Sequence, residues 1–223
     1  VHSASEAAQY ERCQTVVGDL SIHGSDLSHL DAFAALQRVS GTLEISDNPR
    51  LGDVRGLERL ESVGSLAISD NRGLDGLDAL SHLESAHAVV VRNNPNLDTL
   101  RGFEGLAELQ NLSVEHNGII NTVGLENLRT VGSLAVKRNS KLISLAGLRA
   151  LEQASSIEIS GNRLLAAYFG LLPRLQPVGG RVLLRSNDGL AAHEVREVLA
   201  RVGHVSSAPT LAKRAAKREV SLR

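Results

Sequence analysis

The sequence predicts a repeat solenoid, a right-handed parallel β-helix of about eight coils of roughly 23 residues, and three observations support this prediction. An asparagine recurs at intervals of 22 to 25 residues. The same short pattern precedes each one: two aliphatic residues flank a variable position, and two more residues follow. Between these patterns, aliphatic residues fall at every third position. The asparagines are Asn48, Asn71, Asn94, Asn117, Asn139, Asn162 and Asn187.

The pattern before each asparagine is typical of a short β-strand with one buried face. In the unit that ends at Asn71, Leu66 and Ile68 alternate with Ala67 and Ser69, which is the period of two expected of such a strand. An additional first unit carries serine in place of the asparagine. The aliphatic pairs are Leu20/Ile22, Leu43/Ile45, Leu66/Ile68, Val89/Val91, Leu112/Val114, Leu134/Val136, Ile157/Ile159 and Val182/Leu184.

The rest of each unit has a different period. A strict period of three is not the 3.6 of an α-helix, and it suits 3₁₀ turns or extended segments with three residues per turn. Each coil is therefore expected to be a strand followed by an arc of tight turns with inward apolar side chains. After Asn48 these positions are Leu51, Val54, Leu57, Leu60 and Val63.

The recurring asparagines have a structural interpretation. Stacked coils place parallel strands about 4.8 Å apart. At that spacing, each amide can pair with backbone groups left free at the strand-to-turn corner and with the asparagine of the next coil. We therefore expect a structural ladder of seven asparagines, with Ser25 in the first place, rather than a binding site.

The ends of the chain differ from the repeats, as the ends of a solenoid must. We expect a helical cap over residues 1–13, the solenoid over residues 14–189, a cap helix over residues 190–203 and a basic tail or linker over residues 204–223. The tail is interpreted as a disordered linker, or as a basic segment that touches a partner or lipid headgroups. Cys13 is the single cysteine, so an internal disulfide is excluded and it is expected to be a small, partly buried residue or an intermolecular link.

Composition narrows the classes of function. The chain has 24 Lys and Arg against 25 Asp and Glu, and aromatic residues are 2% of it, which disfavours a nucleic-acid partner. No apolar run is long enough to span a bilayer. The eight histidines show no metal-ligand spacing, so we expect neither a metal nor a cofactor. Because the sequence opens on Val1 without a signal peptide, it is expected to be a processed protein or an excised domain.

The string Val63-x-x-Leu66-x-Ile68-x-x-Asn71 resembles a leucine-rich repeat strand, but the next aliphatic residue, Leu74, follows the asparagine by three positions instead of two. With the Val-Gly-Ser lead-in and the Leu-x-Gly-Leu arc, the pattern is similar to the receptor L domain over roughly residues 13–203. That family is the β-helical ligand-binding module of growth-factor receptor ectodomains and many bacterial surface proteins. The resemblance implies binding outside the cytoplasm without catalysis, and the absence of cysteine-rich decoration suggests a stand-alone bacterial version.

The exposed face of the sheet is the first candidate for a binding surface, because it is flat and rigid. Charges of alternating sign on neighbouring strands indicate either a recognition patch or a solvated charge ladder. Small residues at Ser65, Ala67 and Ser69 would leave a shallow step beside it. The candidate ligand-binding residues are Val90, Arg92, Ser113, Glu115 and Lys137.

A second candidate is a pair of acids. Asp47 and Asp70 should lie about 5 Å apart on stacked coils, a separation that fits a retaining-glycosidase pair or part of a calcium site. Against this, Arg50 and Arg72 could neutralise both acids, and Asp-Asn at a strand end is ordinary turn chemistry.

The sequence therefore predicts a non-catalytic extracytoplasmic module that binds a protein or another surface ligand on its exposed sheet face. The first alternative is a structural spacer whose contacts serve assembly. A carbohydrate-active β-helix enzyme is the less favoured alternative.

Overall fold

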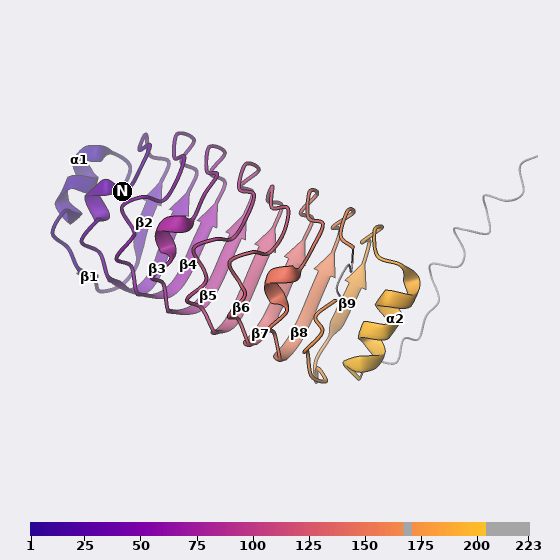
Figure 1. The fold of residues 1–223 in the computed structure, drawn as a ribbon. Helices are drawn as coiled ribbons and strands as arrows, with labels where there is room; N and C mark the ends of the chain where they lie inside the picture. The colour runs from indigo at the N-terminus through magenta and orange to yellow at the C-terminus, as the bar shows by residue number, and fades with distance from the viewer. Residues whose placement is uncertain (167–170, 204–223) are drawn as a thin grey trace, which may run out of the picture.

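A computed structural model describes residues 1–166 and 171–203. They form a parallel β-solenoid with a single nine-stranded sheet along its length (Figure 1). This confirms the predicted fold class. The strands are β1 (Thr15–Val16), β2 (Leu20–His23), β3 (Arg38–Ser46), β4 (Ser62–Ser69), β5 (Ser85–Arg92), β6 (Glu108–Glu115), β7 (Thr130–Lys137), β8 (Gln153–Ser160) and β9 (Val182–Arg185).

The register follows the sequence repeat. Leu43 lies opposite Leu66, and Leu66 lies opposite Val89, so the aliphatic pairs of successive units stack. Both β1 and β2 pair with β3, each with a different part of it, so they are two pieces of one interrupted first rung. The nine strands therefore make eight rungs, joined by about seven turns of the solenoid. Most strands begin earlier than the aliphatic pairs indicate, because the Val-Gly-Ser lead-in also pairs with its neighbours.

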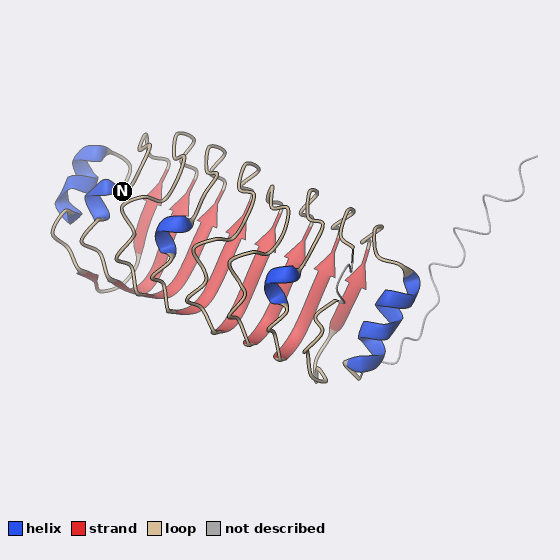
Figure 2. Cartoon of the chain, in the orientation of Figure 1, coloured by secondary structure: helices blue, strands red, loops and turns tan. Residues whose placement is uncertain are grey.

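The interior is a continuous aliphatic core. Leu51, Val54, Leu57 and Leu60, which follow the period of three, are all fully buried. In some coils this arc contains a short 3₁₀ helix, and in others it contains isolated tight turns. Figure 2 shows the helical pieces opposite the sheet. The 3₁₀ turns of the arcs are Asp31–Phe33, Asp78–Leu80 and Ala146–Leu148.

The asparagines form a buried ladder along one corner of the solenoid. The backbone N–H of Asn71 donates to Oδ1 of Asn94 at 3.1 Å, and its Nδ2 donates to the carbonyl oxygen of Ile45 at 2.9 Å. The same pair of bonds recurs from coil to coil. Ser25 takes the first place, where its N–H donates to Oδ1 of Asn48 at 2.9 Å. The side chain of each asparagine thus satisfies an N–H and a carbonyl group of the preceding coil, and the next asparagine satisfies its own backbone N–H, as a buried corner requires.

The residue before each asparagine adopts the left-handed conformation. Its φ is 54° at Asp47, 61° at Asp70, 56° at Asn93, 57° at His116 and 54° at Arg138. This conformation ends the strand and turns the chain so that the next side chain points inward. Asp and Asn tolerate it better than most residues do, so the backbone by itself explains both aspartates.

Short helices lie at both ends of the array. Helix α1 (Ala4–Ala7) continues into a 3₁₀ turn over Ala8–Tyr10, and the ring of Tyr10 lies 5.3 Å from that of Phe33. Helix α2 (Ala192–Arg201) buries Val198 at the other end. The expected basic tail, residues 204–223, lies outside the described residues.

The N-terminal residue adds to the sheet edge. The amino group of Val1 donates to the carbonyl oxygen of Ser21 at 2.6 Å, and the N–H of His23 donates to the carbonyl oxygen of Val1 at 3.1 Å. Cys13 is a free, half-buried thiol whose Sγ donates to the carbonyl oxygen of Thr15 at 3.3 Å. In the described part of the chain, no helix has the length and apolar character to span a bilayer.

Candidate functional site

The outward side chains at the ends of the strands form a column across the sheet, and this column is not uniform. Two consecutive members, Ser46 and Ser69, are small, whereas His23 and Arg92 on either side of them are large. A hollow of about 730 Å³ results at the carboxyl ends of the strands, and we call it the serine groove. It is lined by His23, Glu44, Ser46, Asp47, Ser69, Asp70, Arg72, Arg92, Asn93, Pro95 and His116.

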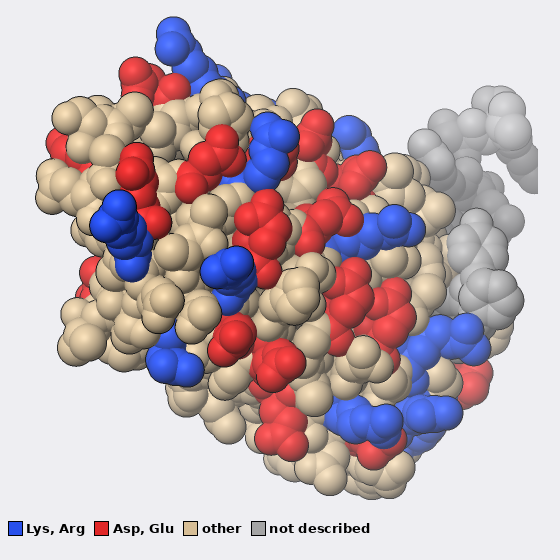
Figure 3. Space-filling model, turned by 60° about the vertical axis from the view of Figure 1, so that its left-hand side comes forward, with Lys and Arg blue, Asp and Glu red and all other residues tan. Residues whose placement is uncertain are grey.

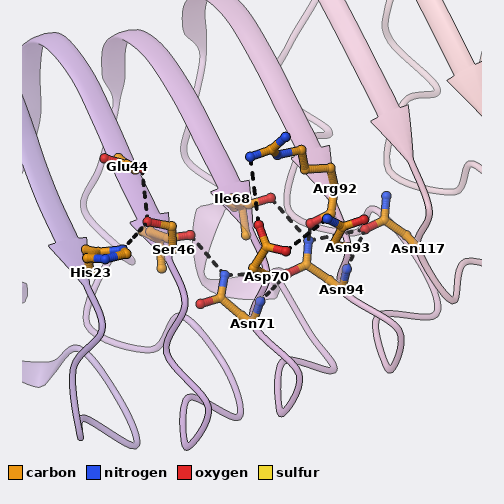
Figure 4. A network of polar contacts seen from close by, with 11 residues as sticks. His23, Glu44, Ser46, Ile68, Asp70, Asn71, Arg92, Asn93, Asn94 and Asn117 are labelled. Carbon is orange, nitrogen blue, oxygen red and sulfur yellow. Dashed lines mark hydrogen bonds and ion pairs between the residues drawn. The ribbon is translucent and has the colours of Figure 1, made fainter.

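One wall of the serine groove is a hydrogen-bonded chain (Figure 4). The hydroxyl of Ser46 donates to Oε1 of Glu44 at 3.0 Å, and Nδ1 of His23 lies 3.0 Å from the same hydroxyl. Because the serine donates its only proton to Glu44, Nδ1 of His23 is the donor in the second hydrogen bond. Ser21 donates to the second oxygen of Glu44 at 3.0 Å, so this carboxylate is held from two strands.

The opposite wall is held more loosely. A guanidinium nitrogen of Arg92 lies 3.8 Å from Oδ2 of Asp70, and Nδ2 of Asn93 donates to Oδ1 of Asp70 at 2.9 Å. The side chains of Arg92 and Asp70 are 57% and 43% exposed. An ion pair this long and this exposed contributes little to stability. Arg92 can therefore leave Asp70 for a ligand at small cost.

Three polar groups of the serine groove are not used by the fold. The hydroxyl of Ser69 and the side chains of Asp47 and Arg72 have no hydrogen-bond or ion-pair partner among the described residues. Ser69 is only 7% exposed, so its hydroxyl lies low in the groove. The site therefore offers a hydroxyl, an anion and a cation within one hollow, a set that suits a polar ligand carrying both signs of charge.

The five residues of the sequence-predicted patch divide into two groups. Arg92, Glu115 and Lys137 are neighbours on β5, β6 and β7, as the register predicts. Glu115 accepts a hydrogen bond from Lys137 at 2.7 Å and another from Ser113 at 2.8 Å, whereas Arg92 turns away to Asp70. Val90 is half-buried beside Ser113. Of the five, only Arg92 lines the serine groove.

Glu115 is the residue whose ionisation this arrangement changes. Burial raises the pKa of its carboxyl, but the hydrogen bonds from Lys137 and Ser113 and the positive charge of Lys137 outweigh the burial. The net result is a pKa below the usual range for glutamate. Because Glu115 and Lys137 form an ion pair with each other, this part of the patch resembles the solvated charge ladder and not a free binding surface.

The two acids considered as a catalytic or calcium pair have other roles in the structure. Both stand at left-handed corners, and Asp70 is held by Arg92 and Asn93. The neutralisation expected from Arg50 and Arg72 does not occur, since neither arginine pairs with either acid. Within residues 1–166 and 171–203, no three His, Cys, Asp or Glu side chains are grouped so that they could hold a metal ion.

Sequence reasoning missed most of the serine groove. It expected a shallow step at Ser65, Ala67 and Ser69, but of these only Ser69 lines the hollow. The available signal was the change in side-chain size along the outer column, from His23 through two serines to Arg92. No comparable feature of the sequence indicates that Glu44 lines the groove, because its place there depends on which neighbouring side chains form hydrogen bonds with its carboxylate.

The surface charge around the site is mixed. Figure 3 shows acidic and basic side chains interspersed over the visible face, with no large area of one sign. Such a surface lacks the positive field that favours nucleic acid.

Comparison with known proteins finds a family match over part of the chain. The receptor L domain family matches residues 12–106, a span that contains all of the groove-lining residues except His116. Among curated proteins, none has significant sequence similarity to the chain. Receptor L domains are non-catalytic ligand-binding modules. Residues 12–106 thus match the receptor L domain family, and the coils after them continue the same sheet in the same register.

Proposed function

We propose that this protein works outside the cytoplasm as a binding module and holds a polypeptide ligand on the exposed face of its sheet, in the serine groove. The observation that carries the proposal is the set of polar groups that the fold leaves unused there, namely Ser69, Asp47 and Arg72. The extracytoplasmic setting rests on the family, whose members are typically extracellular.

A polypeptide suits the groove for physical reasons. A peptide carries carbonyl and N–H groups along its length and side chains of both charges, and the groove presents partners for each of these. The rigid sheet keeps these partners in place before binding, which lowers the entropy lost on association. A carbohydrate would be expected to stack on Phe, Tyr or Trp side chains, and no residue of these three types lines this groove.

Two pairs of variants test the site. Arg92→Ala removes a cation of the groove. Arg185→Ala removes its counterpart on β9, which lies 3.7 Å from Glu158 and is similarly exposed. Ser69→Trp fills the groove floor, and Ser160→Trp makes the same change at the equivalent, equally buried position of β8. All four changes are on the outer face, so none should disturb the core.

Binding would be measured by calorimetry, with a peptide selected on an array against the whole chain. A charge-assisted hydrogen bond contributes about 1.5–3 kcal/mol, so Arg92→Ala should weaken binding about tenfold or more. The two control variants should bind as the wild type does. Unchanged binding by both groove variants would show that the ligand sits elsewhere. If the chain selects glycans and no peptides, the ligand is a carbohydrate and not a polypeptide.

The structural alternative, an assembly spacer, makes a different prediction. The chain would then associate with its own copies, and Arg92→Ala would leave that association unchanged. Sedimentation over a range of protein concentrations separates this outcome from ligand binding.

A further inference from the structure

The edge of the solenoid formed by the loops after the strands changes its chemistry halfway along. Figure 2 shows these loops as a row at the arrow ends of the strands. The fourth residue after the ladder asparagine is Gly52, Asp75 or Asp98 in the earlier coils. The corresponding residue is Ile120 in the coil that follows β6 and Ile143 in the next one.

Backbone hydrogen bonds place these residues side by side. The N–H of Ile120 donates to the carbonyl oxygen of Asp98 at 2.8 Å, and that of Ile143 donates to the carbonyl oxygen of Ile120 at 2.8 Å. The N–H of Ala166 donates in turn to Ile143 at 3.1 Å. The two isoleucines therefore stand next to each other on consecutive loops, and the loop after β8 follows directly.

This half of the edge exposes aliphatic side chains. Ile120 is 42% exposed, Ile143 is 41% exposed, and Leu164 on the loop after β8 is 57% exposed. Among the described residues, one other large hydrophobic side chain is exposed, Val17 at the N-terminal end, which is 89% exposed. Three of the four such residues thus gather on neighbouring loops, although the fold itself has no need of them there.

Basic residues stand on the same loops as two of these aliphatic residues, Arg138 and Lys141 with Ile143 and Arg163 with Leu164. Arg138 and Lys141 are exposed and have no ion-pair partner in the described structure. Arg163 lies 3.5 Å from Asp188, and both side chains are mostly exposed. The other half of the same edge is acidic, since Asp47, Asp70, Asp75 and Asp98 stand there against Arg50 and Arg72.

We propose that the loop edge formed by Ile120, Ile143, Leu164, Arg138, Lys141 and Arg163 docks on an anionic lipid surface. Aliphatic side chains on loops can enter the boundary between headgroups and acyl chains, and neighbouring cations pair with anionic headgroups. The acidic half of the edge is repelled by the same surface. The later coils of the solenoid therefore face the lipid surface. The serine groove, which lies over the earlier coils, stays accessible.

The complementary charge favours lipid over a protein partner. An acidic protein surface could pair with the three cations, but it would also need an apolar recess for side chains on separate loops. A bilayer meets both requirements without a matched shape. The proposal does not depend on the function of the serine groove, because no residue is shared between the two surfaces.

Vesicle co-sedimentation of the whole chain tests the proposal, and the repeat supplies a matched control. Lys141 and Arg50 both stand two residues after a ladder asparagine, one beside the isoleucines and one on the acidic half. Lys141→Ala and Arg50→Ala remove the same charge, so a contribution from basic residues elsewhere in the chain is equal in both. For the apolar part, Ile143→Ser is compared with Val17→Ser.

The wild type should bind vesicles of phosphatidylcholine with phosphatidylserine and not vesicles of phosphatidylcholine alone. A basic side chain near such a surface contributes about 1 kcal/mol, so Lys141→Ala should weaken partitioning about fivefold. Ile143→Ser should weaken it by a similar factor, and Arg50→Ala and Val17→Ser by less than about twofold. Absence of binding to anionic vesicles overturns the proposal. Equal losses for Lys141→Ala and Arg50→Ala also overturn it, because the binding would then be unspecific attraction of the whole charged chain. Capture of an acidic protein without vesicle binding would assign the edge to a protein partner instead.

Discussion

The asparagine ladder makes a quantitative prediction about stability. In the middle of the ladder, Oδ1 of Asn94 accepts from the backbone N–H of Asn71 at 3.1 Å, and Nδ2 donates to the carbonyl oxygen of Ile68 at 3.1 Å. Asn94→Ala leaves both of these backbone groups without that partner in a corner that water does not reach. A buried donor or acceptor left unsatisfied costs about 1–3 kcal/mol. The variant, with two such groups, should therefore lose about 2–6 kcal/mol of the free energy of unfolding.

Urea denaturation followed by circular dichroism measures this loss, and Asn96→Ala is the matched control. Asn96 also bridges two coils, since its Nδ2 donates to the carbonyl oxygen of Arg72 at 2.9 Å, but it is exposed. Water can replace that bond, so the control should lose less than about 1 kcal/mol. Similar losses for the two variants would refute the reasoning, because burial would then not be what makes the ladder important.

Two further predictions concern single positions. Gly102 has a φ of 111°, and a Cβ there would collide with the carbonyl oxygen of Leu77, so Gly102→Ala should lower the free energy of unfolding by about 2 kcal/mol or more. A Cβ at Gly52 would have no atom within 4 Å, so the control Gly52→Ala should change the free energy of unfolding by less than about 1 kcal/mol. Equal losses for the two variants would contradict this account. Lys137→Ala should raise the pKa of Glu115, which NMR titration of its carboxyl would measure. Because the pKa of Glu115 is lower in the folded protein than in the unfolded chain, its ionised form stabilises the fold above the pKa of the unfolded chain. This stabilisation is lost as pH falls through the pKa of the folded protein. The variant should therefore lose less stability on acidification than the wild type. An unchanged pKa would show that Lys137 is not its cause.

The fold could be predicted from the sequence because every coil has the same pattern of buried residues and stacks on its neighbours in the same way. Leu66, for example, lies between the aliphatic residues Leu43 and Val89 of the neighbouring strands, and each of these lies between aliphatic residues in turn, so one correctly assigned unit fixes the others. The interruption between β1 and β2 could not be predicted, because it occurs at the first rung, where no earlier coil constrains the chain. The aliphatic pair alone does not show where each strand begins, because residues before it also pair with the neighbouring strands.

The candidate site was predicted less well, and Arg92 shows the physical reason. Register places it between Asp70-bearing and Glu115-bearing coils, so two carboxylates compete for one guanidinium. Which one it pairs with depends on the rest of each acid's environment. Glu115 is already satisfied by Lys137 and Ser113, so Arg92 turns to Asp70. Periodicity fixes which residues are neighbours, whereas side-chain pairing depends on competition that no spacing encodes.

Binding surfaces of this solenoid should therefore be sought where the residue type at equivalent positions changes from one coil to the next. Inward columns cannot vary without leaving a cavity or an overpacked layer in the shared core. Outward columns have no such restriction, and a change there alters the surface at one coil only. The outer column turns from large to small at Ser46 and Ser69 and creates the serine groove. The loop column turns from acidic to aliphatic at Ile120 and creates an exposed apolar group. Since neither change improves the packing of the coil that carries it, both are better explained by contacts with another molecule than by the fold.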